Sequence, residues 1–217
     1  GQGDELKLGI AAAELNCCVN ISNLSVEKLL PTMKTAYVTK LVDNWTGRYI
    51  VTRAQMYGVD MSNVVVEPYD KIGRTRNGLA FIEVGIGPRP SYQLYDRGHT
   101  ALSKIQPGDI DWEKILDTRW FHTTGIVTAL GEHTATEVLA ALKAAKKNGA
   151  VTSYDLNYRS TLWTKEAARA ARFFAWTRTY RRTLRKVRAL NALPAGWRGP
   201  VIRLYNALAW RLARKGL

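Results

Sequence analysis

The segment DLNYRSTLW, residues 155–163, places an acid, an amide and a guanidinium at alternate positions. Asp155, Asn157 and Arg159 follow the apolar run AVTSY, which predicts that they lie at the end of a strand. A guanidinium held at a strand end can bind a carboxylate or a phosphate through two parallel hydrogen bonds, and the acid and the amide can orient it or bind hydroxyls. The same spacing also fits a structural Arg–Asp pair that closes a loop, and spacing alone does not decide between the two.

The elements that must position this segment alternate between helix and strand. Two apolar runs depart from the alternation, because the Gly/Pro-rich sequence IGPRP joins them as in a β-hairpin. The alternation predicts an α/β layer fold with a mainly parallel sheet, whose ligands bind beyond the carboxyl ends of the strands. The periodicities predict helices over 11–24, 46–58 and 134–149, strands over 35–42, 119–127 and 150–157, and a hairpin over 79–85 and 91–98.

Local signals refine these elements. Thr134 and Glu137 have the spacing of a capping box, and Gly149 stands where a helix commonly ends. Cys17 and Cys18 are adjacent and have no second Cys or His pair at metal-ligand spacing, so we expect buried helix residues in a reducing compartment. The cytoplasm is therefore the expected location.

Charge divides the chain into two parts. The net charge is +14, but residues 1–164 hold 18 basic and 17 acidic side chains, whereas residues 165–217 hold 14 basic side chains and the single acid Glu166. Helices are predicted over 171–190 and 201–217, with aromatic and basic residues interleaved. Such a tail can bind nucleic acid or anionic membrane, can pack as an ordinary helical pair, or can be a fused or out-of-frame segment.

Five segments together resemble the ribokinase-like (PfkB-type) sugar kinases, particularly the 2-keto-3-deoxygluconate kinases. DLNYRSTLW resembles their D-x-N-x-R-x-x-L-W segment, and the other four follow the family order. The resemblance covers about residues 9–170 and implies a Rossmann-like three-layer fold with a small β-sheet lid at about 76–100. It predicts a partial, truncated kinase domain over 1–170 and a basic helical tail over 171–217. The four further segments are AAAELNCCVN, VTKLVDNWTGRYIVTRAQMYGVDMS, LYDRGHTAL and WFHTTGI.

The resemblance also implies residue roles. Tyr95 and Arg97 would reach a sugar acid from the lid, and Arg159 would hold its carboxylate. Ala11 and Ala12 stand where the family has paired glycines, which let the backbone approach the sugar. The full set of implied substrate-binding residues is Ala12, Asn16, Tyr95, Arg97, Ile126, Asp155, Asn157 and Arg159.

The reaction implied by the resemblance is ATP-dependent phosphorylation of a sugar acid such as 2-keto-3-deoxygluconate, with Mg²⁺. Nothing after residue 170 resembles the family's G-A-G-D motif, which supplies the catalytic Asp and the anion hole. We therefore expect this chain to carry the sugar-binding half, to lack the ATP site and to be inactive alone. The family also implies a homodimer formed through the lid. The alternative is a kinase-like, non-catalytic module whose basic tail binds nucleic acid or anionic membrane.

Overall fold

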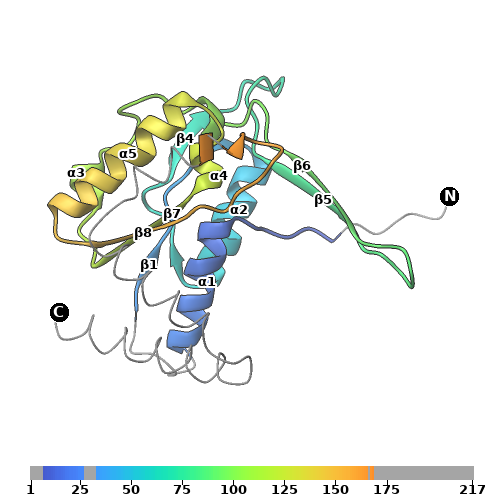
Figure 1. The fold of residues 1–217 in the computed structure, drawn as a ribbon, viewed down its shortest axis with the longest axis horizontal. Coiled ribbons are helices and arrows are strands. Elements are labelled where there is room, and N and C mark those ends of the chain that lie inside the picture. Colours follow the sequence, from blue (N-terminus) through green and yellow to red (C-terminus); the bar gives the residue numbers. More distant parts are fainter. Residues whose placement is uncertain (1–6, 27–32, 166, 169–217) are drawn as a thin grey trace. The chain divides into compact units, whose positions relative to one another are not determined.

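The computed structural model describes residues 7–26, 33–165 and 167–168, and in that part helices and strands alternate as predicted (Figure 1). The predicted tail helices and the domain boundary near residue 170 lie outside the described residues. Within them, no helix combines the length and the apolar character needed to cross a membrane. The described helices are α1 (Ala13–Val26), α2 (Trp45–Met56), α3 (Trp112–Ile115), α4 (Gly125–Thr128), α5 (Glu132–Lys147) and the 3₁₀ turn η1 (Leu102–Lys104).

Three of the four strand pairs in the described part of the chain are parallel, which confirms the predicted α/β class. The predicted strand 35–42 is broken between β1 and β2, but hydrogen bonds from Tyr37 N to Asp60 O and from Val65 N to Thr39 O, both 2.9 Å, bridge the break. The parallel pairs are β1 (Thr35–Ala36) with β3 (Val59–Asp60), β2 (Lys40–Asp43) with β4 (Val65–Pro68), and β7 (Trp120–Thr124) with β8 (Val151–Asp155).

A glycine lets α2 start directly above the end of β2. A Cβ on Gly47 would lie 2.0 Å from the carbonyl oxygen of Val42, so no larger residue fits without moving backbone. The Asn44 side chain caps the helix by accepting from Gly47 N at 3.0 Å. Gly58, with φ +74°, ends the turn after the helix and is the last residue of the predicted helix range 46–58.

The predicted capping box of α5 is wrong. The helix begins at Glu132, so Thr134 and Glu137 are already inside it, and the N-cap Gly131 makes no side-chain cap bond. The Glu137 carboxylate turns inward instead and accepts from Gly108 N at 2.7 Å and Trp112 Nε1 at 2.6 Å. The sequence therefore has the S/T-x-x-E spacing of a capping box, but its glutamate holds the segment from Gly108 to Trp112 against the helix.

The end of strand β7 differs from the prediction, and the end of helix α5 confirms it. Strand β7 ends at Thr124, because the Thr124 hydroxyl accepts from Ile126 N at 3.3 Å and caps α4. The predicted strand 119–127 is therefore too long at its carboxyl end. Gly149, with φ +79°, follows the last turn of α5 as predicted.

The two cysteines are not buried as expected. Cys17 is exposed and Cys18 is half-buried. Helix α1 buries only a narrow stripe, which includes Leu15 and Ser22 at a spacing of two turns. Cys17 lies two positions beyond Leu15 and so points to the other side of the helix.

The hairpin of β5 (Leu79–Glu83) and β6 (Tyr92–Asp96) extends away from the parallel strands (Figure 1). Its strands pair antiparallel, as predicted, and every residue of them except Asp96 is exposed. Arg76 fixes the base, since its guanidinium forms an ion pair with Asp96 and donates to Gly98 O at 2.8 Å.

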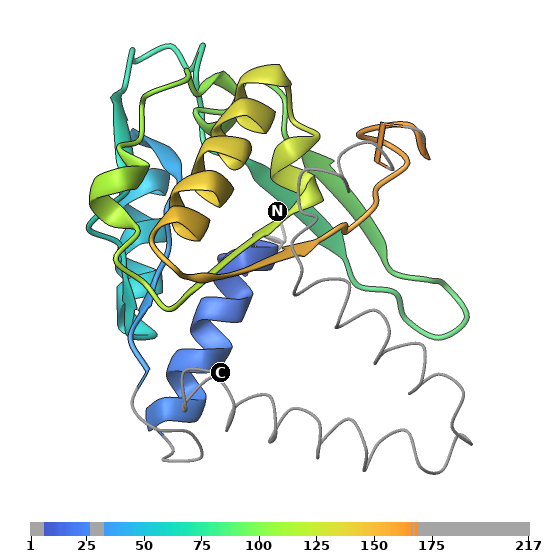
Figure 2. The ribbon, with the colours of Figure 1, turned by 60° about the vertical axis from the view of Figure 1, so that its left-hand side comes forward.

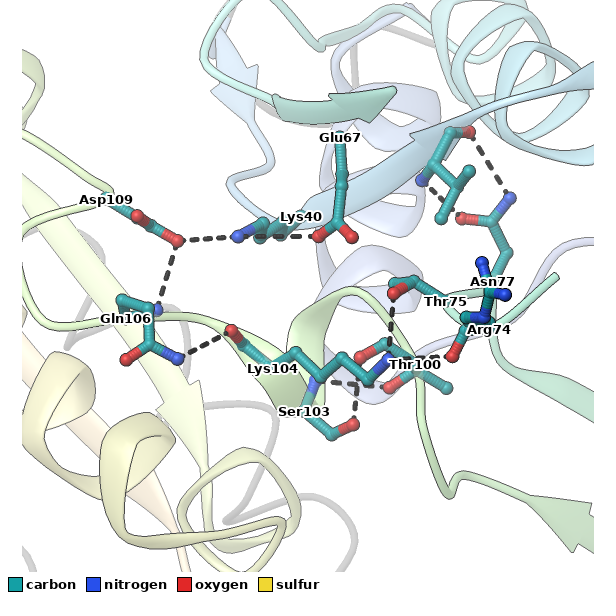
Figure 3. A network of polar contacts seen from close by, with 11 residues as sticks. Lys40, Glu67, Arg74, Thr75, Asn77, Thr100, Ser103, Lys104, Gln106 and Asp109 are labelled. Carbon is teal, nitrogen blue, oxygen red and sulfur yellow. Dashed lines mark hydrogen bonds and ion pairs between the residues drawn. The ribbon is translucent and has the colours of Figure 1, made fainter. Parts of the chain in front are cut away.

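A polar network holds the segments that flank the hairpin against β2 and β4 (Figure 3). Lys40 Nζ lies 2.7 Å from Asp109 Oδ2 and 3.6 Å from Glu67 Oε2. Lys104 Nζ donates to Arg74 O and to Thr75 Oγ1 at 2.7 and 2.8 Å. The two lysines thus connect the chain before the hairpin, the chain after it and the parallel strands.

Candidate functional site

Three of the predicted site residues form a group where the base of the hairpin meets the segment after β8. The Arg97 guanidinium carbon lies 4.0 Å from the centroid of the Tyr95 ring, a cation–π arrangement. Partial burial lowers the pKa of Arg97; Tyr95 opposes this effect and the nearby positive charge of Arg159 adds to it. Arg97 keeps its charge at neutral pH.

Neither arginine of this pair is neutralised within the described residues. No ion pair joins Arg97 or Arg159 to a carboxylate there. Arg159 Nη1 donates only to the neighbouring carbonyl of Tyr158, at 3.2 Å. The structural Arg–Asp pair that spacing allowed is therefore not formed among the described residues, and the charge of Arg159 is near enough to lower the pKa of Arg97.

Asp155 and Asn157 shape the turn instead of holding the arginine. The Asp155 carboxylate accepts from Asn157 N at 3.0 Å, as in an Asx turn. Asn157 takes φ +39°, a left-handed conformation that Asn tolerates. The chain therefore turns sharply after β8, which carries Arg159 back over the strand end.

A glycine at the end of β7 lets this turn close. A Cβ on Gly125 would lie 2.1 Å from Leu156 O and 2.7 Å from Cζ2 of the Trp163 ring. Gly125 is buried, and the indole Nε1 of Trp163 is buried without a hydrogen-bond partner in the structure. The last residue of DLNYRSTLW thus seats the segment on the end of β7, a role that the sequence analysis did not assign.

The start of α1 lies near the same strand end. Partial desolvation of the largely exposed Cys17 raises its pKa, and the negative charges of Glu14 and Asp155 raise it further. The Asp155 carboxylate is therefore close to the first turns of α1, where Asn16 is exposed. This places an amide and a carboxylate on neighbouring elements, both accessible to a ligand.

The remaining predicted residues contribute backbone and packing in the structure. Ala12 packs against the buried cluster that contains Leu15, and its carbonyl accepts from Asn16 N at 2.8 Å. Ile126 is half-buried in the first turn of α4. In the described part of the chain no hydrogen bond joins Ala12, Asn16 or Ile126 to Arg97 or Arg159.

Asn77, which was not predicted from the sequence, links the end of β2 to the start of the hairpin. Its side chain (Figure 3) is buried and accepts from Val42 N at 2.9 Å. It also donates to Asn44 Oδ1 at 3.0 Å and to Thr46 Oγ1 at 2.9 Å. The Asn77 side chain therefore satisfies a backbone N–H of β2 that no neighbouring strand binds among the described residues, and it holds the N-cap residue Asn44 of α2 in position. A local pattern gives no signal for it, because Asn-Gly reads as a turn.

The described residues do not form a metal centre. Over residues 7–26, 33–165 and 167–168, no group of three or more His, Cys, Asp or Glu side chains could hold a metal ion. The predicted site residues offer instead two guanidiniums without a carboxylate partner among the described residues, a carboxylate, an amide and an aromatic ring. Such a set suits a small, hydroxylated anion, because arginine binds carboxylates in a bidentate fashion.

The structural neighbours of this chain are kinases of the ribokinase fold, and they share this α/β arrangement. The crystal structure of 2-dehydro-3-deoxygluconokinase from Thermotoga maritima matches 79% of this chain and 49% of its own, with a TM-score of 0.70 and 35% identity. A PfkB family carbohydrate kinase from Listeria grayi matches 76% of this chain and 48% of its own, with a TM-score of 0.66 and 31% identity.

The curated relatives agree with the structural neighbours. A 2-dehydro-3-deoxygalactonokinase from Haloferax volcanii is 34% identical over 167 residues, which are 76% of this chain and 48% of the relative. No protein-family model matches the chain. The homologues and structural neighbours of this chain are PfkB-family carbohydrate kinases, 2-dehydro-3-deoxygluconokinases among them, which confirms the predicted family. The chain spans about half the length of the curated relatives it matches.

Proposed function

We propose that this chain binds a sugar acid such as 2-keto-3-deoxygluconate, as the substrate-binding part of an ATP-dependent sugar kinase. The observation that carries the proposal is the neighbouring pair Arg97 and Arg159, neither of which has a carboxylate partner among the described residues. The family supports the class of reaction, since relatives are named as kinases of dehydro-deoxy sugar acids.

Electrostatics favours an anionic substrate at this pair. Two guanidiniums near each other repel, and Arg97 is partly buried, so a bound carboxylate relieves both the repulsion and the loss of hydration. Tyr95, stacked on Arg97, restricts the guanidinium to one side of the hairpin. A neutral sugar offers neither relief, so the pair selects for an acid.

The other residues of the set complete the proposed pocket. Asp155 and Asn16 bind the sugar hydroxyls, Asn157 holds the turn that presents Arg159, and the backbone of Ala12 and Ile126 lines the floor. The second substrate is ATP with Mg²⁺, as the family implies, and the reaction is transfer of the γ-phosphoryl group to a hydroxyl of the sugar acid. We assign no catalytic base, and we propose that the chain binds the sugar acid without transferring phosphate by itself.

The hairpin serves as the lid of the proposed site, within a lid segment of about 76–100 and a kinase-like part of 1–170. Its exposed apolar side chains, among them Phe81, Ile82 and Leu94, also make it the proposed surface for a homodimer. The alternative function, binding of nucleic acid or membrane through residues 171–217, concerns a segment outside the described residues.

Calorimetric titration with 2-keto-3-deoxygluconate tests the proposal. Arg159→Ala and Arg97→Ala should each weaken binding by about 30-fold or more, because each removes a charge-assisted hydrogen bond worth about 2 kcal/mol. Arg89→Ala is the matched control, since Arg89 is in the same hairpin but pairs with Glu83 at 2.8 Å.

A neutral sugar, D-fructose, provides the ligand control and should bind at least 30-fold more weakly than the acid by the same reasoning. The proposal fails if Arg159→Ala, with an unchanged circular dichroism spectrum, binds the sugar acid as tightly as the unaltered chain does. It also fails if Arg89→Ala and Arg97→Ala weaken binding equally.

A further inference from the structure

A cavity of about 1110 Å³ separates two of the parallel strand pairs. We call it the interstrand cavity, since the segments 35–39 and 118–123 lie on its two sides. Helix α1 covers it on one face through Cys18, Ile21 and Ser22, and α5 on the other through Thr134, Val138 and Ala141. Figures 1 and 2 show these two helices on opposite sides of β7 and β8.

The first side of the cavity is an unpaired strand edge. Tyr37 N and Thr39 O bond to residues 60 and 65, so the odd-numbered residues of this segment face β3 and β4. In a parallel ladder alternate residues direct both backbone groups to one neighbour, so Ala36 and Val38 direct theirs into the cavity. In the described residues neither pairs with a strand; Ala36 O only accepts from the thiol of Cys18 at 3.6 Å.

The second side is also an unpaired edge. Val151 N donates to Arg119 O at 2.9 Å, so residues 119, 121 and 123 face β8, and Trp120 and His122 face away from it. The Thr118 hydroxyl occupies both backbone groups of Trp120, at 3.4 and 3.1 Å. The backbone N–H and C=O of His122 have no hydrogen-bond partner among the described residues.

Open edges in this position are unusual. Sheets expose edges at their sides, where water satisfies the free groups, whereas these two edges face each other beneath two helices. Glu14 and Thr35 line the cavity, and the oxygens Glu14 Oε1 and Thr35 Oγ1 are also buried without a partner among the described residues. Buried backbone and side-chain polar groups are nearly always paired in native proteins.

The dimensions of the cavity fit one more strand. About five extended residues span roughly 17 Å, and a strand occupies about 4.8 Å within a sheet and about 10 Å between layers, or roughly 800 Å³. The interstrand cavity is larger than this by a margin that side chains can fill. The lining side chains on both helical faces include Ile21, Val127, Val138 and Ala141, so a strand buried there needs apolar residues on both of its faces.

We propose that the interstrand cavity binds a separate, extended, apolar peptide segment of about five residues. The segment forms ladder hydrogen bonds with the edge at Val38 on one side and the edge at His122 on the other, and joins the two parallel pairs into one sheet. Recognition is by strand addition, in which backbone bonds give affinity and the apolar lining selects the side chains.

Hydrogen–deuterium exchange of the full chain, with and without the peptide acetyl-KVIVIVK-amide, tests the proposal. The peptide should slow exchange at least tenfold in segments 36–40 and 120–124, and should leave the hairpin 79–96 unchanged. The same peptide N-methylated at every residue of its VIVIV core keeps its side chains but loses the N–H groups that face both edges, so it should give no protection. Both peptides are used below the concentration at which light scattering detects self-association.

A pair of tryptophan substitutions locates the binding. Cys18→Trp fills the cavity from α1 and should abolish the protection, whereas Cys17→Trp places the same ring on the exposed side of the helix and should preserve it. If Cys18→Trp does not fold, the comparison of the two peptides on the unaltered chain still tests whether binding needs backbone hydrogen bonds. Protection of the amides of Val38 and His122 without peptide, or equal protection by both peptides, would overturn the proposal.

Discussion

The parallel strands and the hairpin are built from similar apolar sequences but sit in opposite environments. In the parallel part, α5 covers its strands so closely that Ala141 and Ala145 are fully buried. In the hairpin, Phe81 and Ile82 remain 53% and 61% exposed, on successive positions and therefore on both faces. Burial in this molecule is thus decided by whether a helix crosses the strand, and apolar composition alone does not produce it.

Because the two regions differ in burial, they should contribute differently to the free energy of unfolding. The parallel part gains free energy from burial of apolar area, from glycines that permit close packing and from buried polar anchors such as Glu137. The hairpin depends on its own ladder and on the Arg76–Asp96 clamp at its base. Substitutions in the first region should therefore lower the free energy of unfolding, and substitutions in the second should leave it almost unchanged.

The largest expected effect is that of Gly47→Ala. The new Cβ would lie 2.0 Å from Val42 O, and backbone must move to accommodate it, so we expect a loss of about 3 kcal/mol in the free energy of unfolding. Urea denaturation followed by fluorescence measures it. Gly98→Ala, at the base of the hairpin, is the control: a Cβ there meets nothing within 4 Å, so we expect a change within about 0.5 kcal/mol. Equal losses in the two variants would contradict the comparison.

The sequence predicted the elements of both regions because their signals are local. The period of α2, its closing Gly58 and the IGPRP turn between the hairpin strands depend on neighbouring residues only. Their burial could not be predicted in the same way. Cys17 lies in a helix of small residues, yet it is exposed because only one narrow stripe of α1 faces the strands.

The candidate site shows the same limit. Tyr95, Arg97 and Arg159 were grouped through a resemblance to a family, and the charge effect of Arg159 on Arg97 depends on a turn that brings two distant segments near each other. Asn77 and Glu137 were missed or misread, because each acts on groups about 30 residues away in sequence. The spacing of nearby residues can wrongly assign a polar residue to a helix cap when its hydrogen-bond partners are distant in sequence.

An intermediate effect is expected from the ion pair of Lys40 and Asp109. The hydrogen bond from Lys40 Nζ lowers the pKa of Asp109. A carboxyl whose pKa is lowered in the folded state stabilises the fold above its unfolded pKa of about 3.9, and this stabilisation is lost as the pH falls through the folded value. Asp109→Asn should therefore cost about 1 kcal/mol at pH 7, and this difference from the unaltered chain should shrink below pH 4.

The matched control for this pair is in the hairpin. Glu83 pairs with Arg89 at 2.8 Å, but both side chains are more than half exposed, so Glu83→Gln should change the free energy of unfolding by less than about 0.5 kcal/mol at any pH. Urea titrations of both variants at pH 7 and pH 3.5 measure the contrast. A pH-independent cost of Asp109→Asn would show that its carboxylate charge does not stabilise the fold.

The smallest effect on unfolding is expected from Phe81 and Leu94, which face each other across the hairpin. Exchanging both for Ser removes a cross-strand pair worth at most about 1 kcal/mol, and because both are half-exposed the parallel part should unfold at nearly the same urea concentration. If the hairpin is the surface between two copies of the chain, the same double variant should sediment as a monomer at concentrations where the unaltered chain associates. Unfolding and association would then respond to different regions of one molecule. A variant that loses several kcal/mol of unfolding free energy without any change in association would instead make the hairpin part of the core.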